Sequence, residues 1–529
     1  MLVIDLPPEV LLKIFSYLHQ RDLVHGVSLV CDVWNELSLW PRLWKHLAFN
    51  LAYDDPDQSY SHFAKINSFV CTLVIHPTHL YQILGNYLFA FSGIQLSNLE
   101  YLHLTDPVSG YLVDTIVQNL TSIKYFQAYF GSKFDMQRCL KLLEGLKMIS
   151  IDFGWYGPQN IDNNLIRFLT KQSCLKKLVL RGWYTLRSET VALILNDFNN
   201  IETLYLSNSE ISNLIVNGNL PIPGLTDFTL RSTKFDDTGI SQLVKRATNL
   251  RNLDVIECSN ITFKGLTEIS KHCPHLESLK FGNLTFIIND RLNFSFHALA
   301  EGCPKLKTIT FVGMKLTLDD DIVCLFKSTK YLECLALSDC DTISDIAICA
   351  LGKYCSNLKQ ITLKNCHKIS AYGIMYLVKH SQRLQTLTIK SCFGIKDYIN
   401  HSTIELSDKT ACVVVEDDIT GTRQKTKLQL ATERIDVFRY SDLSYQHSHL
   451  LTLDMTKCEN ILPRTILSFA KMCPDIRELY LTMNLNLNEV DALCRKVFDT
   501  CIFLGCIKIN ERVIELSSIK TQDESICIT

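Results

Sequence analysis

A short apolar pattern, L-x-x-L-x-L, recurs through most of this chain of 529 residues. The copies that start at Leu332, Leu358 and Leu384 follow one another at intervals of 26 residues. One unit of this length cannot bury its own apolar residues, whereas stacked units bury them against each other, so the period predicts a repeat array. Clear copies start at Leu99, Leu175, Ile201, Leu225, Leu250, Leu276, Leu306, Leu332, Leu358, Leu384, Leu450 and Ile476.

Each repeat is expected to contain a short strand, a turn and a helix. In the unit that starts at Leu358, residues 360–363 alternate as in a strand, and residues 373–378 have the apolar spacing of an amphipathic helix. Stacking such units predicts an α/β fold, a curved solenoid with parallel strands inside and helices outside. Weaker copies start at Ile123, Leu146 and Leu504, and a candidate first, degenerate repeat starts at Val70.

The 21 cysteines fall mostly at two recurring positions of the repeat. Their odd number argues against a complete disulfide framework, and the lack of any C-x-x-C pair argues against a zinc site. We therefore expect buried, small apolar residues rather than disulfides or metal ligands. The position after the strand holds Cys258, Cys340, Cys366, Cys392 and Cys458, and the position before the next strand holds Cys273, Cys303, Cys355 and Cys473.

With these cysteines the repeats resemble leucine-rich repeats of the cysteine-containing subtype. The segment Cys340-Asp341-Thr342-Ile343-Ser344-Asp345 is close to the C-x-x-I-T-D of that family. This subtype is characteristic of F-box proteins, so the resemblance implies an F-box elsewhere in the chain.

The first fifty residues have a different pattern. Proline at the start of residues 7–18 and an apolar stripe that includes Ile14 and Phe15 predict an amphipathic helix. A second helix is expected from Asp22, an acceptable N-cap. These helices could simply cover the end of the solenoid, since a repeat array must cap its terminal apolar face.

The same residues resemble a complete F-box. Leu-Pro-x-Glu, Ile-Phe-x-x-Leu, Asp-Leu, Val-Cys-x-x-Trp and Leu-Trp-x-x-Leu occur in this order within residues 5–48, and Asp32 is the one departure, where the family usually has a basic residue. The resemblance implies binding to a Skp-type adaptor, which connects to a cullin and a RING subunit. The residues that match the docking motif, some of which must form the domain's own core, are Leu6, Pro7, Ile14, Phe15, Leu18, Leu23, Val30, Cys31 and Trp34.

By this resemblance the chain is the substrate-recognition subunit of an SCF-type E3 ubiquitin ligase, and its repeats bind the target protein. Several strand positions that face away from the core are basic, which would suit an acidic or phosphorylated segment. Such positions are polar in any solenoid, so this pattern alone decides little. The candidate target-binding residues are Arg181, Tyr205, Arg231, Lys280, Lys364, Lys390 and Tyr480.

Interruptions of the period mark insertions, which map to loops. Two are short, at residues 154–158 and 283–296. The third separates Leu384 from Leu450 by 66 residues, enough for one degenerate repeat around Cys412 and a mixed-charge insertion. We expect that insertion near residues 416–445, and the polar composition of residues 417–427 favours disorder.

The domain organisation predicted from these patterns has four parts. Residues 1–50 form the F-box, residues 51–97 connect it to the repeats and include the possible first degenerate repeat, residues 98–512 form the solenoid, and residues 513–529 form a tail.

Composition and missing motifs exclude other classes of protein. A formal net charge of −2 argues against a nucleic-acid binder, and no apolar run approaches the length of a membrane span. The absence of a basic leader predicts a cytoplasmic or nuclear protein. Phosphate-loop, dinucleotide and hydrolase motifs are absent, so we expect neither an enzyme nor a cofactor. A receptor whose target binding depends on a small molecule, and a scaffold without ligase coupling, stay open as alternatives.

Overall fold

The structure is a computed structural model. It describes residues 6–50, 65–76, 97–105, 122–129, 145–152, 172–184, 186, 188–197, 200–209, 211, 221–282, 296–314, 319–395, 402–407, 410–416, 423–429, 449–458, 460–510 and 512–515. The chain divides into two compact units, unit 1 (Met1–Phe235) and unit 2 (Asp236–Thr529).

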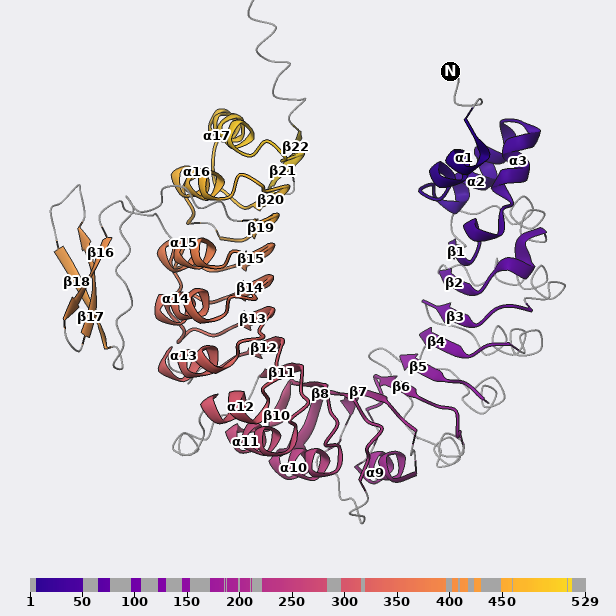
Figure 1. The fold of residues 1–529 in the computed structure, drawn as a ribbon, viewed down its shortest axis with the longest axis horizontal. Helices are drawn as coiled ribbons and strands as arrows, with labels where there is room; N and C mark the ends of the chain where they lie inside the picture. The colour runs from indigo at the N-terminus through magenta and orange to yellow at the C-terminus, as the bar shows by residue number, and fades with distance from the viewer. Residues whose placement is uncertain are drawn as a thin grey trace, which may run out of the picture. The chain divides into compact units, whose positions relative to one another are not determined.

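Unit 1 begins with a cluster of short helices: α1 (Pro8–Phe15), α2 (Gln20–His25), η2 (Val27–Leu29), α3 (Asp32–Ser38) and η3 (Pro41–Leu43). A proline starts α1, where the missing backbone N–H costs no helical hydrogen bond. Helix α1 packs against α3, and η2 packs against both α2 and α3 (Figure 1). Leu11, Phe15 and Leu23 are buried between them, and the Phe15 ring meets the Trp34 ring edge-on at 5.2 Å.

A parallel sheet follows these helices in unit 1. Each strand pairs with the next one in the chain, and the register aligns equivalent positions of the repeat, for example Leu102 with Phe126 and Phe126 with Ile149. All three side chains are buried, which confirms the inward positions expected from the pattern. The elements are β1 (His46–Asn50), η4 (Asn67–Phe69), β2 (Thr72–His76), β3 (Tyr101–Leu104), β4 (Tyr125–Tyr129), β5 (Met148–Asp152), β6 (Lys177–Arg181), α9 (Ser188–Asp197), β7 (Thr203–Ser209) and β8 (Asp227–Asp236).

The sheet begins earlier than the sequence analysis predicted. Strand β1 lies inside residues 1–50 and pairs in parallel with β2, with Leu47 opposite Leu73. Val70 therefore starts the second repeat, and Trp44 starts the first, 26 residues earlier. The end of the F-box-like motif and the first strand of the sheet therefore overlap within residues 1–50.

Unit 2 repeats the strand and helix alternation more regularly. Its strands pair in parallel from β11 to β21, and its helices lie together on one side of the sheet (Figure 1). This is the α/β leucine-rich-repeat solenoid that the period predicted. The elements are α10 (Asp237–Arg246), β9 (Asn252–Ile256), β10 (Cys258–Asn260), α11 (Phe263–His272), β11 (Ser278–Gly282), α12 (Phe296–Gly302), β12 (Thr308–Val312), α13 (Asp319–Ser328), β13 (Cys334–Ser338), α14 (Asp345–Tyr354), β14 (Gln360–Lys364), α15 (Ala371–His380), β15 (Thr386–Lys390), β19 (Thr452–Met455), α16 (Pro463–Met472), β20 (Glu478–Leu481), α17 (Leu487–Thr500), β21 (Cys506–Ile509) and β22 (Arg512–Glu515).

Acidic residues connect successive helices of unit 2. Asp345, the first residue of α14, accepts hydrogen bonds from the backbone N–H of Ser370 at 2.8 Å and from its hydroxyl. Ser370 in turn caps α15. Removal of the Asp345 carboxyl from water raises its pKa to about 6, although the bonds from Ser370 and from the Gly373 backbone act in the opposite direction. The same arrangement joins Asp237 to Thr262.

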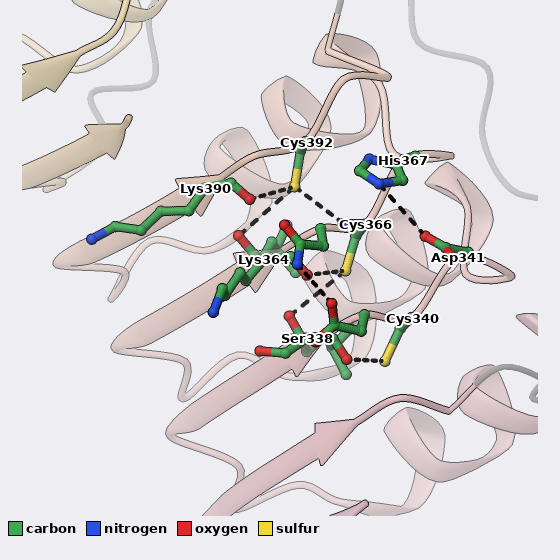
Figure 2. A network of polar contacts seen from close by, with 12 residues as sticks. Ser338, Cys340, Asp341, Lys364, Cys366, His367, Lys390 and Cys392 are labelled. Atoms are coloured by element: carbon green, nitrogen blue, oxygen red, sulfur yellow. Dashed lines mark hydrogen bonds and ion pairs between the residues drawn. The ribbon is translucent and has the colours of Figure 1, made fainter. Parts of the chain in front are cut away.

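The cysteines that follow the strands also connect successive repeats, through hydrogen bonds from a backbone N–H to the sulfur of the next cysteine (Figure 2). The backbone N–H of Cys366 donates to Cys392 Sγ at 3.4 Å, and the N–H of Cys392 donates to Cys458 Sγ at the same distance. These cysteines and Cys340 are completely buried, and none of the described cysteines forms a disulfide. The prediction that they are small buried residues is confirmed.

The interruption between β15 and β19 contains a separate sheet. Strand β15 pairs directly with β19, while β16 (Ser402–Ser407), β17 (Thr410–Glu416) and β18 (Arg423–Gln429) pair with one another in antiparallel order. The predicted degenerate repeat around Cys412 is therefore wrong, because that strand does not join the parallel sheet. The expected disorder is wrong for residues 423–427, which lie in β18, and residues 417–422 lie outside the described residues.

Three further observations bear on the sequence predictions. Strand β22 pairs antiparallel with β21, so the ordered end of the sheet extends to Glu515 instead of residue 512. Within the described ranges, no helix combines the length and apolarity required to traverse a bilayer, and no group of three or more His, Cys, Asp or Glu residues is placed to hold a metal ion. The short interruptions at residues 154–158 and 283–295 lie outside the described residues.

Candidate functional site

Apolar side chains are exposed on several elements of the helix cluster in unit 1. On α1 and just after it, Val10, Ile14 and Leu18 are each about two-fifths exposed. On η2 and the start of α3, Leu29 is 76% exposed and Val33 is 56% exposed. Single exposed apolar residues are ordinary, but this many on about forty residues give a small domain an unusually apolar surface.

Helix α1 explains how one short sequence supplies both a core and a surface. Leu11 and Phe15 lie one turn apart and are buried, whereas Val10 and Ile14 lie one turn apart and face solvent. The helix is apolar around more than half of its circumference, which is more than the domain's own core requires. The exposed half therefore has no partner among the described residues of the chain.

The structure sorts the predicted docking residues into two groups. Phe15 and Leu23 are only 1% and 2% exposed, so they hold the domain together and cannot contact a partner directly. The other predicted residues reach the surface fully or in part: Leu6, Pro7, Ile14, Leu18, Val30, Cys31 and Trp34.

Sequence reasoning missed several exposed apolar residues of the same cluster. Val10, Leu29 and Val33 were not among the predicted docking residues, although each of them is more exposed than Ile14 and Leu18. Their signal was present, because each one continues an apolar run beyond what one helix face can bury. Tyr17 and Trp40 are exposed as well. We use the term docking surface for Val10, Ile14, Leu18, Leu29, Val30 and Val33.

The sequence profile of the F-box-like family matches residues 3–50, which contain this whole helix cluster and the docking surface. The amino-terminal part of unit 1 is an F-box-like domain. Its one departure from the motif, Asp32, is the first residue of α3. A carboxylate there interacts favourably with the positive end of the helix dipole, so the acidic residue stabilises the helix that it starts.

Two solved structures resemble the chain remotely. The crystal structure of the Rad7 and Elc1 complex in yeast contains a chain with 15% identity and a TM-score of 0.43, over 73% of this chain and 88% of that one. A leucine-rich-repeat protein of Leptospira interrogans has 14% identity and a TM-score of 0.36, over 89% of this chain and 96% of that one.

The second candidate site is the open face of the sheet, the strand positions that point away from the buried leucines. In unit 1, the Arg181 guanidinium stacks over the Tyr205 ring at 4.6 Å, and it lies 3.9 Å from the Asp152 carboxylate. Arg231 stands on β8, two strands from Arg181 and in the same row of the register, with Ser207 of β7 between them. Two of the predicted residues, Arg181 and Tyr205, are thus brought together.

On the open face of unit 2, acidic neighbours neutralise two of the predicted basic residues. Lys280 lies 3.8 Å from Asp254, and Lys390 lies 2.9 Å from Asp454. Lys364 projects beside Lys390 from the neighbouring strand, and no ion pair involves it within the described residues (Figure 2).

Tyr480 lies next to Asp454 in the register of β19 and β20. The open face of unit 2 therefore has mixed charge. It is not the continuous basic strip that a list of its lysines suggests.

Proposed function

We propose that this chain is the substrate-recognition subunit of an SCF-type E3 ubiquitin ligase. Its F-box-like domain binds a Skp-type adaptor through the docking surface, and the adaptor connects it to a cullin and a RING subunit. The open face of the solenoid binds the target protein. The chain itself contributes proximity between target and ubiquitin-charged enzyme and carries out no chemistry.

One observation carries this proposal: the F-box-like domain fills its own core with Leu11, Phe15 and Leu23 and still exposes an apolar surface on α1, η2 and α3. A domain that served only to cap the solenoid would have polar residues on that side. Burying such a surface against an adaptor would also stabilise a small domain whose core is limited.

The test is assembly of the ligase on the full chain. The double variant Ile14→Asp with Val30→Asp places two charges in the docking surface without changing a buried residue. Co-expressed with a Skp-type adaptor and a cullin, the variant should recover less than a tenth of the adaptor and cullin that the natural chain recovers. Both proteins should show the same circular dichroism and the same thermal unfolding temperature.

A matched control separates docking from a general effect of surface charge. Tyr331→Asp changes a residue of unit 2 that is 62% exposed and distant in sequence from the docking surface. It should recover the adaptor as well as the natural chain does. Undiminished recovery by the Ile14 and Val30 variant would contradict the proposed function.

A further inference from the structure

The open face of unit 1 contains an uncharged aromatic region. At the positions of β3 and β4 that point away from the buried leucines stand Tyr101, His103, Tyr125, Gln127 and Tyr129, all partly exposed. None of these residues carries a formal charge at neutral pH when the histidine is neutral. We call these five residues the aromatic face.

The open face of unit 2 differs in composition from the aromatic face of unit 1. Strands β12 to β15 have threonine, serine, alanine, valine, cysteine, glutamine and lysine at the equivalent open positions, and no aromatic residue. Tyrosine and arginine dominate the residues that contribute most to protein binding, whereas serine and threonine contribute little. The open face of unit 1 is therefore the better candidate for target recognition.

The rings of the aromatic face are held in place before any partner arrives. Tyr101 contacts the Tyr125 ring at 6.3 Å between centroids and meets the His103 ring edge-on at 6.5 Å. The Tyr101 hydroxyl donates to Gln127 Oε1 at 2.9 Å, which orients the Gln127 amide nitrogen as a free donor. Side chains that are already fixed lose less conformational entropy on binding.

Arg181 adds a positive group on the same side of the sheet. Strands β4, β5 and β6 pair in register, so Tyr129, Asp152 and Arg181 follow one another across the face. Tyr205 holds the guanidinium from the far side at 4.6 Å. Arg181 is 46% exposed and its ion pair with Asp152 is long at 3.9 Å, which leaves N–H donors for a carboxylate from a partner.

We propose that the aromatic face and Arg181 together bind an extended segment of the target protein, with an apolar residue such as leucine or proline over Tyr101 and Tyr125 and a carboxylate at Arg181. This inference rests on the proposed function and assigns its target-binding site. Arg181 lies two to three strands from Tyr101 and Tyr125 and four residues further along the strand direction than the position in register with them. With strands about 4.8 Å apart and about 3.3 Å per residue, the two anchor points are roughly 18 Å apart, a distance that about five extended residues span. The segment therefore has its acidic and apolar residues about five positions apart.

Chemical complementarity favours a segment with one acidic and one apolar residue over a strongly acidic segment. A strongly acidic segment would meet no basic residue on β3 and β4, and Lys280 and Lys390 of unit 2 are already paired with aspartates. An extended chain has unpaired backbone carbonyls, and the Gln127 amide and the hydroxyls of Tyr125 and Tyr129 supply donors for them. Aromatic rings also pack well against proline and leucine side chains.

The test uses the full chain in complex with its adaptor and three fluorescent eight-residue peptides in a glycine and serine background. The matched peptide carries a glutamate five positions before a leucine-proline pair. The second peptide has lysine in place of the glutamate, and the third has serines in place of leucine and proline. By fluorescence anisotropy, the matched peptide should bind at least tenfold more tightly than the other two.

Two variants make the assignment specific. Tyr125→Ala should lower the affinity for the matched peptide at least tenfold. Arg181→Glu should reverse the preference, so that the lysine peptide binds more tightly than the glutamate peptide. Lys364→Glu, a charge change of the same size on the open face of unit 2, should leave both affinities unchanged. Thermal unfolding of each variant controls for loss of structure.

The outcomes separate this inference from the proposed function, because adaptor recovery is measured for every protein. Equal affinity for the three peptides, no measurable binding, or a preference that follows Lys364 instead of Arg181 would overturn the binding site while adaptor recovery stays intact. Failure to recover the adaptor with the natural chain would overturn the proposed function and would leave the peptide preference of the solenoid as a separate result.

Discussion

The indole N–H of Trp44 donates a hydrogen bond to the backbone carbonyl of Ser38, 2.6 Å away, and both residues are buried. Ser38 ends helix α3, and Trp44 stands at the first apolar position of the first repeat. The F-box-like domain and the start of the sheet therefore share one core inside unit 1, without a flexible linker between them.

Trp44→Phe tests this connection. The substitution keeps an aromatic ring but removes the donor to Ser38, so it should destabilise unit 1 by about 1–3 kcal/mol. Trp44→Ala should cost more, about 3–5 kcal/mol, because it also opens a cavity. Urea unfolding of the full chain measures both, and limited proteolysis should show cleavage between α3 and β1. Equal stability of the phenylalanine variant and the natural chain would contradict a structural role for the hydrogen bond.

Gly373→Ala should destabilise unit 2 strongly. A Cβ atom at this position would lie 2.3 Å from Oδ1 of Asp345 and 2.8 Å from its Cγ, so the aspartate would have to leave its hydrogen bonds with Ser370. We expect a loss of roughly 2–4 kcal/mol in urea unfolding. Gly505→Ala is the matched control, because a Cβ there meets nothing within 4 Å, and it should change stability by less than about 0.5 kcal/mol.

The carboxyl group of Asp345 should make the stability of unit 2 depend on pH. Its pKa is raised from 3.8 to about 6, so the folded state binds the proton more tightly than the unfolded state does. This contribution to stability is complete below pH 3.8 and is lost as the pH rises through about 6. The full loss is on the order of 3 kcal/mol, since one pKa unit corresponds to about 1.4 kcal/mol.

The measurement compares the natural chain with Asp345→Asn, which cannot titrate, by urea unfolding at pH 4 and pH 7.5. The natural chain should lose stability relative to the variant over this interval. Parallel curves for the two proteins would show that Asp345 does not titrate between these values.

The cysteines should divide sharply by reactivity. Burial raises the pKa of the Cys273 thiol and of the Cys355 thiol to about 12, so neither forms a thiolate at neutral pH, whereas Cys174 and Cys324 are exposed. Iodoacetamide at pH 7.5 should label Cys174 and Cys324 within minutes and the buried cysteines only in guanidinium chloride. Labelling of Cys355 at the rate of Cys324 in the folded protein, read by mass spectrometry, would contradict the burial of the cysteines that precede the strands.

The repeat architecture could be predicted from sequence because its signal is periodic and redundant. Each L-x-x-L-x-L places its second and third apolar residues inward, and the buried leucines and cysteines of unit 2 follow that rule. The start of the sheet was predicted wrongly, although Trp44-x-x-Leu47-x-Phe49 has the spacing of the repeat. The resemblance of the same residues to the end of an F-box obscured this signal.

The docking residues were only partly predictable for a physical reason. Helix α1 is apolar on two faces, and spacing alone cannot tell which face packs against α3. Burial of Phe15 and exposure of Val10 are decided by tertiary packing. The charge of the open face could not be predicted from sequence either. The pairing of Lys390 with Asp454 joins residues that are 64 positions apart and separated by the inserted sheet.

Hydrogen exchange of the full chain with and without a Skp-type adaptor tests the central proposal most directly, because it locates the contact without altering a residue. Adaptor binding should slow amide exchange in peptides that cover α1, η2 and the start of α3, and it should leave strands β11 to β15 of unit 2 unchanged. Unchanged exchange across residues 8–38, or protection confined to unit 2, would contradict the assignment of the docking surface.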